Sequence, residues 1–381
     1  MSLVVPTLEQ LRARSSEKWT AYPPDVLPAF VAEMDFGLAE PVKAALREAV
    51  ERDDCGYANP AGFARAVAGF AARRFAWSVD PDRVFLVPDV MAGAAEALRV
   101  LTAPGDPVVI NPPVYAPFAA TLDEVRRPIV EVPLLRDAEG RYDIDLAGLE
   151  AAFARGARAY LFCNPHNPVG RVFARETVVA IAELARTYDV LVLADEIHAP
   201  LALSGATHTP FVSLGDRLGH RALTLTAASK AFNIAGLKCA AIVAGSAPVR
   251  DALRRLPAEV RYRAGILGVR ASIAAFERGD AWLDELRDYL DENRNYLSEL
   301  LAAEIPQIRY IQPEASYLAW LDCTNLNLGE NPAHAFLTKG RVALSRGLDF
   351  GKQGAHHVRL NMATSKALLT DIVARMKTAL P

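Results

Sequence analysis

The sequence contains few cysteines, and no two of them stand close together. Only four of its 381 residues are cysteines, each among apolar neighbours: Cys55, Cys163, Cys239 and Cys323. No CxxC pair suggests a zinc site, and isolated thiols in apolar surroundings are typical of a reducing compartment. We therefore predict a cytoplasmic protein with buried thiols and no bound metal.

An excess of charge of one sign and long apolar runs are also missing. The chain has 42 Lys and Arg against 45 Asp and Glu, a formal net charge of −3, so nothing points to nucleic acid or to an anionic membrane surface. No apolar stretch approaches the length that spans a bilayer, and the N-terminus does not read as a signal peptide. No DNA-binding extension is expected before residue 20. The 51% of hydrophobic residues nevertheless suffices for a large core in two domains.

Short apolar runs alternate with amphipathic stretches in the middle of the chain. Helices are predicted at 41–52, 91–101 and 175–188, and strands at 83–87, 107–111, 158–163, 190–195, 222–227 and 240–245. Apolar strands separated by helices are typical of a parallel sheet buried on both faces. In such α/β sheets a ligand lies beyond the carboxyl ends of the strands.

This alternation stops near residue 275. A long helix is predicted at 281–304, followed by strands at 316–322 and 357–363 and a C-terminal helix. The first forty residues look irregular, with "AYPPDVLP" as a proline-rich extended stretch. We predict three parts: an N-terminal arm that packs with the small domain (1–40), a large domain (41–275) and a small C-terminal domain (276–381).

Lys230 stands directly after a predicted strand, in the stretch "TAASKAFNIAGLKCA". Its neighbours are small and an apolar run precedes it, whereas Lys18 and Lys43 read as ordinary solvated lysines. A lysine in such a place either extends its head to water or has a lowered pKa and forms a Schiff base. On this stretch alone both interpretations stay open.

Asp195 ends the apolar run of "VLVLADEIH", where a carboxylate requires a cationic partner. The partner is either a metal, for which "DEIH" is a poor signature, or a protonated heterocyclic nitrogen. The turn into the helix at "PDVMAGAAEAL" (88–98) offers backbone N–H groups to a phosphate. It is not a Walker A loop, because no GK[ST] follows, and no strand is followed by GxGxxG.

Two further segments complete a set of ligand-binding features. Asn167 lies in "CNPHNPVG", where two prolines stiffen the chain, either as a plain turn or to hold the amide toward a ligand. Tyr115, in "NPPVYAPF", offers an aromatic face. A Schiff-base lysine, an acid beside an aromatic cation, a phosphate-binding turn and a planar face together suit pyridoxal 5′-phosphate.

The sequence resembles the fold-type-I aminotransferase superfamily, and more closely its branch of cystathionine β-lyases and related carbon–sulfur lyases. The resemblance covers nearly the whole chain, through "KWTAYPPDVLPAFVAEMDFG", "CGYANPAG", "FCNPHNPVG", "ADEIHAPL", "TAASKAFNIAGLKCA", "SYLAWLD" and "VRLN". It implies an α/β fold whose large domain has a mostly parallel seven-stranded sheet, with a smaller α/β C-terminal domain. The implied reaction is β-elimination from cysteine S-conjugates. An aminotransferase, one recruited to a natural-product pathway included, and a role in binding a partner protein are the alternatives.

The resemblance also implies roles for individual residues around pyridoxal phosphate. Lys230 would hold the cofactor and act as the base, Asp195 would pair with its ring nitrogen, and Asn167 would donate to its ring hydroxyl. Tyr115 would stack on the ring, beside His198, which stands where many superfamily members have tyrosine. The phosphate would be held by the amides of Val90 and Met91 and by the Ser229 hydroxyl.

Three residues are implied to bind substrate or to act between subunits. Arg359 would bind the α-carboxylate of an amino-acid substrate, although taken alone it reads as a surface ion pair. Asp35, in "EMDFG", would lie at the pocket mouth. Tyr57 would reach the partner's cofactor in a homodimer with shared active sites, or else be a core tyrosine. At two positions the phosphate-binding pattern departs from the family, with Ala227 for a serine, which Ser229 or Thr226 would replace, and Lys238 for an arginine.

Overall fold

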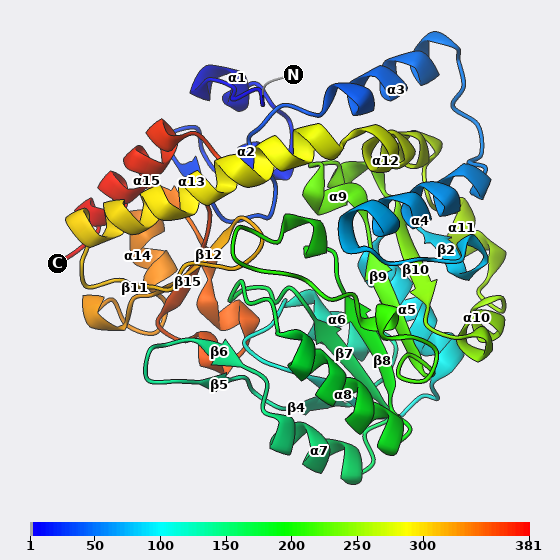
Figure 1. Ribbon diagram of the computed structural model, residues 1–381. Helices are drawn as coiled ribbons and strands as arrows, with labels where there is room; N and C mark the ends of the chain where they lie inside the picture. Colours follow the sequence, from blue (N-terminus) through cyan, green and yellow to red (C-terminus); the bar gives the residue numbers. More distant parts are fainter. Residues whose placement is uncertain (1–2) are drawn as a thin grey trace.

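A seven-stranded sheet forms the centre of the large domain, in the order β2-β10-β9-β8-β7-β3-β4 (Figure 1). The computed structural model describes residues 3–381. The strands of this main sheet are β2 (Val84–Val87), β3 (Val108–Ile110), β4 (Ile129–Glu131), β7 (Ala159–Cys163), β8 (Leu191–Asp195), β9 (Ala222–Thr226) and β10 (Ala240–Ala244). β10 is antiparallel to both neighbours, and the other pairs are parallel. The six predicted strands are confirmed. The resemblance implies a seventh strand, but its position at β4 was not predicted, because two of its three residues are exposed and the third is half-buried.

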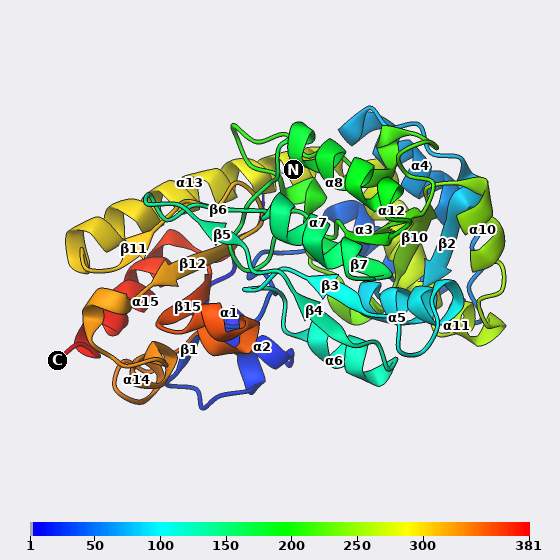
Figure 2. The same cartoon turned by 90° about the horizontal axis from the view of Figure 1, so that it is seen from below.

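Helices cover both faces of the main sheet. The helices between residues 40 and 278 are α3 (Glu40–Glu51), α4 (Ala61–Phe75), α5 (Val90–Leu101), α6 (Pro117–Glu124), α7 (Leu146–Ala154), α8 (Arg175–Thr187), α9 (Ala228–Ala231), α10 (Ala247–Leu253), α11 (Ala258–Tyr262) and α12 (Ile266–Arg278). Figure 2 shows α7 and α8 on one face and α5 and α6 on the other. Side chains of β8 alternate between the two faces, with Val192 in one apolar cluster and Leu193 in the other. Burial on both faces explains why these strands read as continuous apolar runs.

The C-terminal domain is built on a four-stranded antiparallel sheet in the order β11-β12-β15-β14. Its strands are β11 (Arg309–Tyr310), β12 (Leu318–Asp322), β14 (Ser345–Arg346) and β15 (His357–Asn361), and its helices are α13 (Asp280–Glu304), α14 (Pro332–Thr338) and α15 (Lys366–Thr378). The long helix α13 runs beside α15 and back to the large domain (Figure 1). A hairpin of β5 (Leu135–Arg136) and β6 (Tyr142–Asp143) leaves the large domain and lies near β11 and β12 (Figure 2). The domain boundaries at residues 40 and 275 stay a prediction.

The N-terminal arm is more regular than predicted. It contains α1 (Leu8–Arg12), α2 (Glu17–Thr20) and β1 (Leu27–Pro28), and β1 pairs in parallel with β13 (Val342–Ala343) of the C-terminal domain. Thr7 and Gln10 form a capping box that starts α1, a helix of five residues that is too short to stand out in the sequence. No helix in residues 3–381 is long and apolar enough to cross a membrane.

One cysteine departs from the prediction of buried thiols. Cys55 is exposed, whereas Cys163, Cys239 and Cys323 are buried. Cys55 follows the end of α3 in the turn "DDCGY", where the chain has left the core. Two aspartates and a glycine flank it, so the prediction of a buried thiol is wrong for Cys55.

Candidate active site

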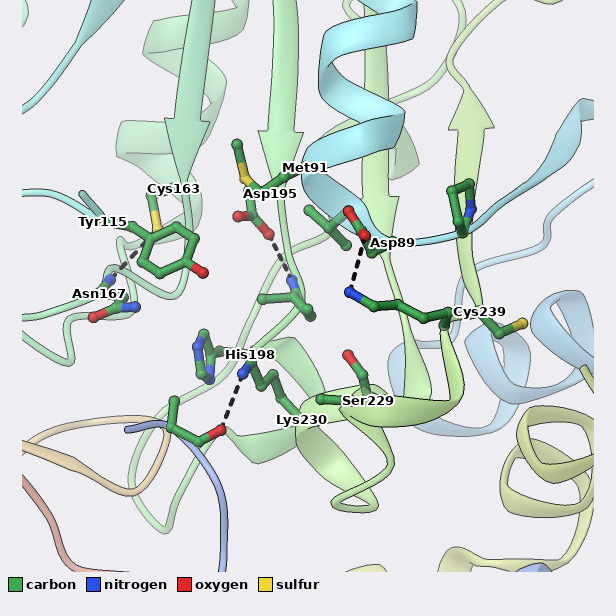
Figure 3. Close-up of a pocket in the computed structure, with 16 residues that line it drawn as sticks. Asp89, Met91, Tyr115, Cys163, Asn167, Asp195, His198, Ser229, Lys230 and Cys239 are labelled. Atoms are coloured by element: carbon green, nitrogen blue, oxygen red, sulfur yellow. Dashed lines mark hydrogen bonds and ion pairs between the residues drawn. The ribbon is translucent and has the colours of Figure 1, made fainter. Parts of the chain in front are cut away.

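A cavity of about 320 Å³ lies at the carboxyl ends of β7 and β8 and at the start of α5 (Figure 3). Most of the residues predicted from the sequence meet here. The lining includes Val90, Met91, Tyr115, Asn167, Asp195, His198, Ser229 and Lys230. Figure 3 shows Tyr115 and Asn167 on one side and Asp89 and Cys239 on the other, with Asp195 and Lys230 between them. Parallel strands place their carboxyl ends at one edge of a sheet, which explains why these distant segments converge.

Lys230 follows β9 and points into the cavity, where its Nζ donates to the carbonyl of Ala32 at 3.0 Å. Burial lowers the pKa of Lys230 to about 8, and the positive charge of Arg359 acts in the same direction. The Lys230 amine is therefore held inside the cavity by a hydrogen bond to a carbonyl group of the protein. A lowered pKa is what a nucleophilic or basic lysine requires.

Asp195 ends β8 and is 4% exposed. One carboxylate oxygen accepts from the N–H of Ile197 at 3.1 Å, and the other has no hydrogen-bond partner within residues 3–381. Burial raises the pKa of Asp195 to about 7. A buried carboxylate without a cation partner fits the protonated ring nitrogen of pyridoxal phosphate. That positive charge would favour the ionised form of Asp195.

The start of α5 leaves backbone donors free for a phosphate. Asp89 caps the helix by accepting from the N–H of Ala92 at 2.8 Å. The N–H groups of Val90 and Met91 precede any intrahelical acceptor, so they are available to an anion. Lys238 lines the same part of the cavity, with its Nζ 3.3 Å from Asp89. An ammonium beside free amides suits the cofactor's phosphate group.

The serine that would replace the missing one is Ser229 in this structure. Ser229 lines the cavity, whereas Thr226 lines a different, small pocket under β9. Thr226 is the last residue of β9, whereas Ser229 stands in α9, beyond the end of the strand. Of the two candidates, only Ser229 is placed to meet the phosphate.

Arg359 lies on β15 and is buried, 6% exposed. Its guanidinium donates to Asn167 Oδ1 at 2.9 Å, to the Phe30 carbonyl at 2.9 Å and to Ser345 Oγ at 3.1 Å. Within the described chain it has no carboxylate partner, which excludes the reading as a surface ion pair. Because Asn167 accepts through its oxygen, its NH₂ group stays free to donate to a ring hydroxyl.

His198 is neutral, because burial and the charges of Lys230 and Arg359 lower its pKa to about 3. Its Nδ1 lies 3.0 Å from Ser316 Oγ, and Ser316 has a left-handed φ of 73°. Such a φ is uncommon for a non-glycine residue and is found at sites that tertiary contacts fix. The hydrogen bond with the Ser316 hydroxyl therefore holds the His198 imidazole in one orientation at the cavity.

The prediction that Lys18, in the N-terminal arm, is a solvated lysine is wrong. Lys18 is 1% exposed, and its Nζ lies 2.9 Å from Asp35 Oδ2. Asp35 also accepts from the indole N–H of Trp19 at 3.0 Å, so both its oxygens have partners. The structure thus places Asp35 in a buried ion pair outside the cavity lining, and its role in substrate binding stays a prediction.

Tyr57 is separated from the cavity of its own chain. Its side chain is 85% exposed and contacts Tyr262 edge-on, with 5.6 Å between ring centroids. It is therefore not a core tyrosine. The predicted contact with a partner's cofactor stays a prediction.

The hydrogen bonds that hold residues 30–36, which we name the strap, were not predicted, although "EMDFG" led to Asp35 of this segment being expected at the pocket mouth. Every carbonyl in it accepts from a side chain: Phe30 from Arg359 and Ser345, Val31 from Asn361, Ala32 from Lys230 and Tyr317, Glu33 from Lys18 and Asn361, Met34 from Asn233 and Arg14, and Asp35 and Phe36 from Arg14. Carbonyl groups are common to all residues, so no pattern could reveal it. Tyr317, in the quoted "SYLAWLD", was the one available signal.

Residues 31–376 match the family model described as aminotransferase class I and II. The chain belongs to the aminotransferase class I and II family. This family member is 44% identical over 98% of its length to a Mycobacterium leprae protein named "Putative cystathionine beta-lyase", covering 97% of that protein. It is 38% identical to "Cystathionine beta-lyase PatB" of Bacillus subtilis, over 93% of each. Cystalysin from Treponema denticola, whose structure contains pyridoxal 5′-phosphate, superposes with a TM-score of 0.91 at 28% identity, over 97% of this chain and 96% of that chain.

These similarities confirm the predicted fold, cofactor and enzyme class. The family member is a pyridoxal-phosphate-dependent enzyme of the carbon–sulfur lyase branch. The residues fit the cofactor: a lysine with a lowered pKa, a buried carboxylate with a free oxygen and unpaired helix amides line one cavity.

Proposed function

We propose that this enzyme is a β-lyase that cleaves the carbon–sulfur bond of cystathionine or a related cysteine S-conjugate. The products are a thiol, pyruvate and ammonia. The observation that carries the proposal is that Lys230 and Asp195 share one cavity, beside a buried arginine, Arg359, that lacks a carboxylate partner in the described chain. Relatives named as cystathionine β-lyases support the substrate class.

Each of these residues has a defined task. Pyridoxal phosphate, when bound, supplies an electron sink for charge that develops at the α-carbon. Asp195 favours protonation of the ring nitrogen, and Lys230, in its neutral form, accepts the α-proton. Arg359 offers a planar set of N–H donors to the α-carboxylate. Its Nε is buried without a partner in the described chain, so at least one donor is free.

The outcome depends on the substituent at the β-carbon. With sulfur there, the carbon–sulfur bond breaks after the α-proton has moved to Lys230, and the thiolate leaves with the electron pair. Water then converts the remaining three-carbon unit into pyruvate and ammonia. A substrate without a leaving group would be directed to amino transfer instead.

Incubation of the purified holoenzyme with cystathionine tests the proposal. We expect pyruvate, ammonia and free thiol in equal amounts without any added keto acid, and none of them from Lys230→Ala. Amino transfer that requires a keto acid, with no thiol released, would contradict the proposal and favour an aminotransferase.

A further inference from the structure

A second cavity, rich in arginine, lies between the β5–β6 hairpin and the C-terminal sheet. It encloses about 250 Å³ and has no lining residue in common with the active-site cavity. Figure 2 shows the hairpin beside β11 and β12. The charged residues that line it are five arginines and two acids: Arg136, Arg141, Arg171, Arg294, Arg309, Glu314 and Asp322. Positive charge is therefore in excess there.

Part of this positive charge is already compensated within the chain. Arg136 donates to Asp322 at 2.6 Å, and Arg171 is paired with Glu314. Arg141 and Arg309 are different, because neither has a carboxylate partner among residues 3–381, and both are exposed. One Nη of Arg309 donates to the Ala138 carbonyl at 2.7 Å, and its other N–H groups, with the Arg141 guanidinium, are available to an anion from outside.

His357 adds a buried polar atom that lacks a partner. The residue is 4% exposed, lines the cavity and stacks on Trp320, with 4.9 Å between ring centroids. Its Nδ1 lies 2.8 Å from the Ala355 carbonyl, so Nδ1 carries the proton and Nε2 a lone pair. Nε2 has no hydrogen-bond partner in the described chain, and the nearest carboxylate oxygen, of Asp322, is itself an acceptor at 3.9 Å.

Burial lowers the pKa of His357, which keeps the ring neutral. A buried acceptor without a donor costs free energy unless a water or a ligand supplies the hydrogen. The cavity therefore presents two kinds of group together, guanidinium donors and one imidazole acceptor.

We propose that this cavity binds a small oxyanion that also carries a hydroxyl group, such as hydrogen phosphate, a phosphate monoester or a hydroxy-polycarboxylate. The negative oxygens would accept from Arg141 and Arg309, and the hydroxyl would donate to His357 Nε2. Arginine forks suit phosphate and carboxylate oxygens equally, so both sources share this chemistry. A water molecule occupies roughly 30 Å³ in the liquid, which leaves room here for an organic anion.

The test measures anion binding to the holoenzyme, in which the phosphate-binding turn at α5 is occupied by the cofactor. Inorganic phosphate, sulfate and citrate are titrated at constant ionic strength set with chloride, by calorimetry and by tryptophan fluorescence. Sulfate matches the charge of hydrogen phosphate but has no hydroxyl. The variant is R141Q/R309Q, and the matched control is R155Q/R158Q, which removes two exposed arginines elsewhere.

We expect phosphate or citrate to bind, sulfate to bind more weakly, and R141Q/R309Q to lose at least about tenfold in affinity, since each charge-assisted contact is worth that much. The control should bind as the wild type does. Binding of phosphate but not citrate would identify phosphate compounds as the ligand class. Binding of citrate but not phosphate would identify polycarboxylates.

No saturable binding by the wild type would overturn the proposal, as would equal binding by R141Q/R309Q. Equal affinity for sulfate and phosphate would show that His357 Nε2 does not accept from the ligand. It would thereby contradict the proposed ligand chemistry. Should the double variant fold poorly, Arg141→Glu gives the same readout from one exposed position. None of these outcomes depends on the substrate of the active site.

Discussion

Burial acts in opposite directions on the two titratable groups at the centre of the cavity. It raises the pKa of Asp195 to about 7 and lowers that of Lys230 to about 8. The pKa values of both groups are thus shifted toward neutral pH, as is common where proton transfer takes place. At the scale of single residues, this pair is where function conflicts with stability.

The cofactor-free protein should show that conflict as a pH dependence of stability. Folded Asp195 keeps its proton up to about pH 7, whereas the unfolded residue loses it near its ordinary value of 3.8. The stability from this group is full below pH 4 and is lost as pH rises through 7. Urea unfolding should find Asp195→Asn gaining roughly 2–4 kcal/mol over the wild type between pH 4 and pH 8. A difference that does not change with pH would contradict the raised pKa.

The same substitution should impair catalysis more than cofactor binding. An amide cannot hold the ring nitrogen protonated, so the ring becomes a poor electron sink. In Asp195→Asn we expect kcat to fall at least about a hundredfold, with KM little changed and the cofactor still bound. Steady-state kinetics with a measurement of bound cofactor check this. Activity equal to the wild type would show that Asp195 does not serve the ring.

At the scale of elements, the strap (30–36) links the arm to both domains. Its carbonyls accept from Asn233 in the large domain and from Arg359 and Asn361 on β15. Lys18 contributes twice, by bonding the Glu33 carbonyl and by pairing with Asp35. The buried pair therefore fixes the geometry of the segment that meets Lys230.

Breaking this pair should destabilise the fold strongly. Lys18→Met leaves the Asp35 carboxylate buried without a cation, and we expect a loss of about 3–5 kcal/mol in the free energy of unfolding. Lys18→Met combined with Asp35→Asn should recover much of it, since the amide still accepts from Trp19. Denaturant unfolding measures both.

Lys43→Met is the matched control for that measurement. Lys43 is a partly exposed lysine whose only carboxylate neighbour in residues 3–381, Glu40, is 3.9 Å away. Its replacement should change stability by less than about 0.5 kcal/mol. An equal effect of Lys18→Met and Lys43→Met would refute the importance of the buried pair.

The sequence allowed prediction of elements that carry their signal locally. Six strands of the main sheet and the positions of Lys230 and Asp195 follow from apolar runs and from the residues just after them. The burial of Lys18 could not be predicted, because its partner carboxylate, Asp35, lies in the strap, outside α2, and no local pattern links the two residues. β4 and the strap could not be predicted for a similar reason, since β4 pairs with the backbone of β3 and the strap accepts from side chains of distant segments.

At the scale of the whole molecule, the exposed Tyr57 is the residue that one chain leaves unexplained. We propose that it completes the active site of a partner in a symmetric dimer. Mixing inactive Tyr57→Ala and Lys230→Ala protomers should then restore part of the activity, because one site of the heterodimer carries neither defect. Activity assays after subunit exchange measure this.

Two results would contradict the shared site. If Tyr57 acted within its own chain, both sites of every heterodimer would stay defective, and mixing would restore nothing. A fully active monomer, identified by its mass in solution, would exclude the model directly. Tyr262→Ala is the control, since it removes the aromatic neighbour and leaves Tyr57 in place.

The pairing of β1 with β13 has a consequence for the order in which the protein matures. Leu27 finds its strand partner at Val342, and the Phe30 carbonyl meets Ser345, 315 residues later in the chain. A ribosome therefore delivers the arm first and its binding partners almost last. Until β15 is synthesised, the strap is held by Arg14, Lys18 and Asn233 but not yet by Arg359 and Asn361, so the segment that meets Lys230 is fixed only as the chain is released. Nascent chains that stop before residue 342 should form the main sheet yet leave the arm open to proteases.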